Sequence, residues 1–219
     1  MYGYALCIRE EIYVSGHPMV LATKNNIAQV YASEERYGEA ISLFETVIRE
    51  YRENSTEDSA FLAAVYDNLS TAYREMERYE DAIDICIEVL NIRKNIYGKR
   101  SLDYAISLNN LALIYYEMGI LNDAADIFSE ALAIKKETLP EIHGQISIGY
   151  FNLGLVYDKL HRDNEALENY RASMEINNEL EAYEDVLLTA EYIAEIYERN
   201  DMLEDAEAYR TLCSKDDVH

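Results

Sequence analysis

A seven-residue segment recurs along this chain at a fixed spacing, and no other feature restricts the fold as strongly. Four copies can be aligned: NNIAQVY (25–31), DNLSTAY (67–73), NNLALIY (109–115) and FNLGLVY (151–157). Successive copies lie 42 residues apart, and a fifth, EYIAEIY (191–197), follows after 40. Self-similarity at a period of this length predicts an array of one repeated structural unit.

Alanines repeat in phase with these segments and indicate a second helix in every unit. They are Ala40, Ala82, Ala124, Ala166 and Ala206. Apolar side chains follow four and eight residues later in most copies, as Phe128 and Leu132 do after Ala124. This rhythm marks one face of a helix, so each unit is predicted to be helix A, a short turn and helix B. Because the chain holds only 8 Gly and 2 Pro, an all-α fold is expected.

The columns L-(A/G)-x-x-Y, then Ala, then an aromatic residue four positions later, resemble the tetratricopeptide repeat (TPR). That repeat usually has about 34 residues. The longer period, with segments such as ALCIREEIYVSGHP (5–18) and SLNNLALIYYEMGILNDAADIFSEALAIKKETL (107–139), is similar to the long repeats of kinesin light chains and many bacterial regulators. The resemblance covers nearly the whole chain and implies an α-solenoid, a right-handed superhelix of antiparallel helix pairs. It says little about function, since this scaffold serves many partners.

We therefore predict a single TPR-like array over residues 1–213, followed by a polar tail at 214–219. The array comprises a partial repeat at 1–16 and five repeats at about 18–56, 57–99, 100–139, 140–180 and 181–213. Helices are expected at 2–13, 18–33, 37–53, 57–75, 79–96, 101–117, 121–137, 141–159, 163–178, 182–199 and 203–212. Helix 2–13 aligns with the end of helix B in later repeats and lacks its helix A. It is either the edge of a fragment, which we favour, or an N-terminal cap, and its uncovered face is expected to self-associate.

Two columns are predicted to form the contact between helices A and B. The small residues Ala28, Ser70, Ala112, Gly154 and Ala194 lie where the two helices must approach closely. The tyrosines Tyr31, Tyr73, Tyr115 and Tyr157 fall on the same face, and their rings are expected to pack between helices with the hydroxyl groups near the edge.

The second asparagine of each segment lies on the other side of helix A. Asn110 is about 150° from the centre of the stripe formed by Leu111, Ala112 and Tyr115. In an array of this kind that side lines the concave surface where solenoids bind partners. The column Asn26, Asn68, Asn110 and Asn152 could therefore hold a peptide backbone through its amide groups, a use that the resemblance also implies. Alternatively, these side chains bond to neighbouring helices and set the angle between repeats; both roles remain open.

Other positions on the same side complete the predicted peptide-binding site. They are Gln29, Ile106, Leu113, Ile148, Leu155 and Tyr192. The four aliphatic side chains point away from the core and form a patch that predicts an apolar partner, unless a neighbouring helix covers them.

The charge balance disfavours some partners. With 19 Lys+Arg and 42 Asp+Glu, the net charge of −23 repels nucleic acid and anionic membranes. It would attract a basic partner, or it serves only to keep the protein dissolved. No apolar run approaches a membrane span, and Cys7, Cys86 and Cys213 are scattered, so a reducing, cytoplasmic setting is expected.

No arrangement of residues typical of catalysis, a metal site or a cofactor site occurs in the sequence. His17 and His143 lie three periods apart in the same inter-repeat column, which favours a structural role. We therefore expect a non-enzymatic interaction scaffold that binds a peptide or a partner helix in its concave groove. The alternative is a peptide-responsive regulator of bacterial type whose superhelix changes when the ligand binds.

Overall fold

The computed structural model describes residues 9, 12–13, 16–55, 57 and 59–214 of the 219. These residues form ten α-helices and no strand. The helices are α2 (Pro18–Ser33), α3 (Tyr37–Asn54), α4 (Ala60–Glu75), α5 (Tyr79–Tyr97), α6 (Leu102–Glu117), α7 (Leu121–Thr138), α8 (Gly144–Lys159), α9 (Asp163–Glu179), α10 (Tyr183–Arg199) and α11 (Leu203–Ser214). The predicted helix at 2–13, with its self-association, lies largely outside the described residues.

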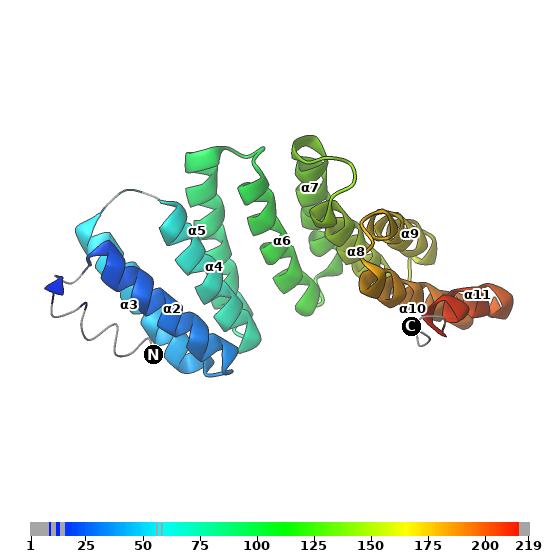
Figure 1. Cartoon of the computed structure of the whole chain (residues 1–219), viewed down its shortest axis with the longest axis horizontal. Coiled ribbons are helices and arrows are strands. Elements are labelled where there is room, and N and C mark those ends of the chain that lie inside the picture. Colours follow the sequence, from blue (N-terminus) through cyan, green and yellow to red (C-terminus); the bar gives the residue numbers. More distant parts are fainter. Residues whose placement is uncertain (1–8, 10–11, 14–15, 56, 58, 215–219) are drawn as a thin grey trace. The chain divides into compact units, whose positions relative to one another are not determined.

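The chain divides into two compact units, Met1–Lys99 and Arg100–His219, at the predicted boundary between the second and third repeats. In the first unit α2 packs on α3 and α4 on α5, and α3 also packs on α4. In the second, the pairs are α6 with α7, α8 with α9 and α10 with α11, linked by contacts of α7 with α8 and α9 with α10 (Figure 1). Within each unit, the predicted arrangement of successive helix pairs is confirmed.

Two helices begin three residues later than the sequence predicts, because capping side chains precede them. The helix expected from residue 57 starts at Ala60, where the Ser59 hydroxyl accepts a hydrogen bond from the Leu62 N–H at 3.1 Å. The helix expected from residue 141 starts at Gly144, where His143 Nδ1 accepts from the Gln145 N–H at 3.0 Å. His17 caps α2 in the same way, so the structural role predicted for these two histidines is confirmed.

The predicted columns between helices A and B form the core. All five small residues are buried. A Cβ atom added at Gly154 would lie 2.5 Å from two ring carbons of Tyr170, which shows how closely α8 and α9 approach. The tyrosine rings are buried or half-buried, and the Tyr73 hydroxyl donates to Glu45 Oε1 at 2.7 Å. Both columns therefore have the predicted packing role.

Candidate functional site

The candidate binding surface consists of the side of the A helices that faces away from their paired B helices. In the second unit we define the "A face" by three residues from each of α6, α8 and α10. These are Ile106, Asn110, Leu113, Ile148, Asn152, Leu155, Leu188, Tyr192 and Glu195. The A helices adjoin one another there, since α8 contacts α6 through Asn152 and α10 through the Phe151 ring.

Apolar side chains on the A face are unequally exposed. Ile148 is 47% exposed and Leu188 is 45% exposed, and these two residues belong to the same repeat column as the half-buried Ile106. Leu113 and Leu155 are half-buried, and each packs against a buried cluster of its own unit. The exposed apolar area is therefore concentrated on α8 and α10.

Two members of the asparagine column bond to neighbouring A helices. Asn152 Nδ2 donates to Asn109 Oδ1 at 3.1 Å, and Asn68 Nδ2 donates to Asn25 Oδ1 at 3.3 Å. Asn152 is only 8% exposed, contrary to the expectation that a position so far from the core stripe would be open. The reason is the adjoining A helix, which covers that side of α8.

These bonds correspond to the inter-repeat role that was predicted as an alternative for the asparagines. Each donating amide also has a carbonyl oxygen and a second N–H to offer, although burial restricts access to those of Asn152. The acceptors Asn25 and Asn109 were not predicted. They occupy the first position of the repeated segment, where Asn25, Asp67 and Asn109 follow one another at the same 42-residue step, and that column could have identified them.

In the first unit, the predicted residues Gln29 and Asn68 come together. They line a hollow of about 190 Å³ with Ala32, Tyr37, Phe44, Thr71 and Ala72. Asn26 and Gln29 are exposed, and Asn68 is half-buried. This hollow is small, so it could receive one side chain of a ligand rather than a whole molecule.

Tyr192 stands in the asparagine column but packs in an aromatic cluster. Its ring lies 5.4 Å from that of Phe151 and 5.5 Å from that of Tyr170, measured between centroids. Tyr170 is fully buried, its hydroxyl has no hydrogen-bond partner among the described residues, and burial raises its pKa. Tyr192 remains half-buried, so one edge of this cluster reaches the A face.

Charged groups at the end of the A face are held by ion pairs. Arg199 bonds to Asp158 and to Asp163, and the hydrogen bond from Arg199 holds the pKa of Asp163 below its usual value. The Lys159 ammonium lies 4.1 Å from the centre of the Tyr116 ring. Both cations are therefore already engaged by neighbouring side chains.

Within the described part of the chain, no three His, Cys, Asp or Glu side chains are grouped to hold a metal ion. Cys86 is buried, and burial raises the pKa of its thiol to about 11, so it is a neutral packing residue at pH 7. None of the described helices is long and apolar enough to cross a membrane.

Comparison with known families gives the repeat its name. The tetratricopeptide repeat profile matches residues 19–85 and 61–137, and a second tetratricopeptide repeat profile matches 149–180. The chain belongs to the tetratricopeptide repeat family. The predicted resemblance to TPR proteins is thereby confirmed, whereas a search of curated proteins returns no match.

Solved structures similar to this chain include proteins with TPR-like repeats. BtubC (BKLC) from P. vanneervenii is 19% identical, with a TM-score of 0.83 over 100% of this chain and 89% of that one. A putative kinesin light chain from Podosopora anserina, with nearly identical TPR-like repeats, is 20% identical, with a TM-score of 0.77 over 90% of this chain and 95% of the other. The Rap conjugation gene regulator of plasmid pLS20, in complex with the Phr* peptide, is 18% identical, with a TM-score of 0.68 over 88% and 52%. At such identities the likeness concerns the fold.

Proposed function

We propose that this TPR protein is an interaction scaffold that binds a peptide or a partner helix along its A helices. The exposed column of Ile148 and Leu188 carries the proposal, because it presents aliphatic surface on a chain with a net charge of −23. A ligand of apolar side chains with some positive charge would cover that column and complement the surrounding charge. Leu113 and Leu155 flank the column and extend the apolar contact.

The asparagines have a secondary part in this proposal. Asn68 and Asn152 bond to neighbouring helices, so they order the A helices that present the apolar column. Asn26 and Gln29, which are exposed, are the amides best placed to bond a ligand directly. Asn110 belongs to the same column and lies on the A face between Ile106 and Leu113.

A peptide-responsive regulator is a second candidate function. The Rap regulator of plasmid pLS20, which shares the fold, is known in complex with the Phr* peptide. In such a regulator the bound peptide changes the arrangement of the repeats, whereas in a scaffold it does not. Small-angle scattering of the chain with and without a bound peptide would distinguish the two functions.

The apolar column can be tested with peptides selected against the whole chain from a display library. The double variant Ile148→Gln and Leu188→Gln should weaken the selected peptides at least about tenfold, because two apolar contacts are lost. Its melting temperature should stay close to that of the original chain, since both side chains are exposed. Ile87→Gln, at an exposed isoleucine of α5, is the matched control and should bind normally. Unchanged affinity in the double variant would exclude the column as the binding surface.

The asparagine column can be tested by comparing two members. Asn152→Ala should lower the free energy of unfolding by up to about 1 kcal/mol, because a largely buried hydrogen bond to Asn109 is lost. Asn26→Ala should leave it unchanged or slightly higher, since the Asn26 side chain is exposed and alanine is the better helix former. Urea denaturation measures both, and equal stability of the two variants would contradict a structural role for Asn152.

A further inference from the structure

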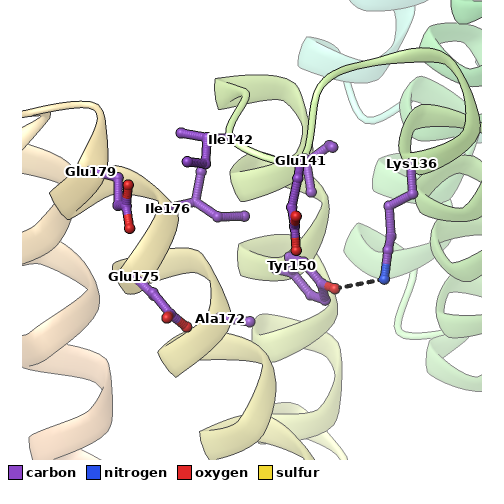
Figure 2. Close-up of a pocket in the computed structure, with 9 residues that line it drawn as sticks. Lys136, Glu141, Ile142, Tyr150, Ala172, Glu175, Ile176 and Glu179 are labelled. Carbon is purple, nitrogen blue, oxygen red and sulfur yellow. Dashed lines mark hydrogen bonds between the residues drawn. The ribbon is translucent and has the colours of Figure 1, made fainter.

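A second hollow lies in the second unit, on a different side of α8 from the A face, and we call it the back pocket. It has a volume of about 600 Å³ and is lined by residues of α7, the loop before α8, α8 itself and α9 (Figure 2). Ile146 and Tyr150 line it from α8, whereas Ile148, between them in sequence, points to the A face. The volume is within the range of about 300–1,000 Å³ found for ligand pockets.

The floor of this back pocket is apolar. Ile146 belongs to a buried cluster of α6, α7 and α8, and Ile176 packs against that cluster from α9. Ile142, in the loop before α8, is 45% exposed and lies close to Ile176 in Figure 2. An isoleucine left this open beside buried apolar neighbours provides a contact surface for the aliphatic part of a ligand.

The walls of the back pocket are acidic. Glu175 and Glu179 are four residues apart on α9, so both carboxylates lie on the pocket side of that helix. Among the described residues, no cation lies within ion-pair distance of either. Across the pocket Lys136 donates to the Tyr150 hydroxyl at 2.9 Å, and this bond, with the nearby Glu141, raises the pKa of Lys136 (Figure 2). The one lysine of the lining is therefore held at the wall opposite Glu175 and Glu179.

We propose that the back pocket binds an arginine side chain from a basic, apolar segment of a partner protein. Three carboxylates against one lysine leave the lining with a charge of −2, which an incoming cation would reduce. A guanidinium group has five N–H donors in a planar fork, enough to bond Glu175 and Glu179 together, and its aliphatic stem can lie on Ile142 and Ile176. An ammonium group is more strongly hydrated and offers fewer donors to paired carboxylates. The back pocket is separate from the A face, so arginine binding there does not depend on the A-face proposal.

A titration followed by isoleucine methyl NMR tests the proposal. The probe is a short capped peptide that alternates leucine and arginine, and its control has citrulline, which is neutral and of the same shape, in place of arginine. The arginine peptide should shift the methyl signals of Ile142, Ile146 and Ile176 in the whole chain. The citrulline peptide should bind about tenfold more weakly or not at all.

Matched variants separate a specific pocket from general attraction to an acidic protein. The double variant Glu175→Gln and Glu179→Gln should weaken the arginine peptide about tenfold, whereas Glu168→Gln, two turns earlier on α9 and outside the pocket, should not. In the Ile148→Gln and Leu188→Gln variant the arginine peptide should still shift the methyl signals of Ile142 and Ile176, so failure of the A-face proposal would be seen separately. Shifts at Ile148 instead of Ile142, equal binding of the citrulline peptide, or equal affinity in all glutamate variants would each overturn the proposal.

Discussion

Replacement of Gly154 by alanine is expected to destabilise the second unit by about 2 kcal/mol. The added Cβ would stand 2.5 Å from Cδ1 and Cε1 of Tyr170, far inside the contact distance of two carbon atoms. Alanine favours the helix over glycine by about 1 kcal/mol, so the steric clash must cost more than this for the variant to be less stable.

The ring of Tyr170 has no room to yield. It is fully buried, with the Phe151 ring at 5.6 Å and the Tyr192 ring at 5.5 Å between centroids. Accommodation of the methyl group therefore requires α8 and α9 to move apart, which loosens the aromatic cluster on both sides.

The measurement should report on these two helices rather than on the chain as a whole. Native-state hydrogen exchange of the α8 and α9 amides provides this, because repeats can open locally. Gly144→Ala, at the start of the same helix with nothing within 4 Å of the new Cβ, is the control and should be neutral or stabilising. In a Tyr170→Leu background the Gly154→Ala change should cost less. Equal protection in Gly154→Ala and Gly144→Ala would show that the close approach of α8 and α9 does not limit stability.

The close helix contact at Gly154 could be predicted from the sequence, because it depends only on the period. Position 154 shares a column with Ala28, Ser70, Ala112 and Ala194, and a column of small residues on the core face of helix A indicates close packing. The same alignment of repeats also predicts where the turns lie and which helices pair. These features lie within one repeat, where helical geometry fixes which side chains meet.

Contacts between repeats could not be predicted in the same way. The helical angle of Asn152 places it away from helix B, but it does not give the distance to the A helix of the preceding repeat. Because the two A helices lie close together, Asn152 is buried and bonds to Asn109. The back pocket is a similar case, since Ile142 and Ile176 are brought together by the loop before α8.

The burial of Lys135 could be predicted in part, because the position of this residue on the core face of α7 follows from the period. The apolar stripe of α7 runs through Ala124, Phe128 and Ala131, and the next position on the same face is residue 135. The structure buries Lys135 there, with only 1% of the residue exposed. A lysine on the core face of a helix is costly, because burial disfavours its charged form.

Lys135→Met is expected to raise the stability of the second unit by about 2–3 kcal/mol at pH 7. Burial lowers the pKa of the Lys135 ammonium to about 8, against 10.5 for an unperturbed lysine. Below pH 8 the folded protein carries a buried charge and the destabilisation is fully present. Between pH 8 and 10.5 the unfolded chain binds more protons than the folded one, so this contribution to stability improves as the pH rises. Methionine has a similar shape, no charge, and flexibility enough to fill the site.

The difference between the original chain and the Lys135→Met variant should therefore be largest at pH 7 and should shrink steadily between pH 8 and 10.5. Taking the difference removes the titration of the chain's 20 tyrosines, which both proteins share. Urea denaturation at pH 7, 8, 9 and 10 measures it. Lys136→Met is the matched control: this neighbour is exposed and bonded to Tyr150, so its replacement should bring no gain and no pH-dependent gap. A Lys135→Met variant no more stable than the original chain at pH 7 would mean that the ammonium reaches water, since only a hydrated charge escapes the penalty of burial.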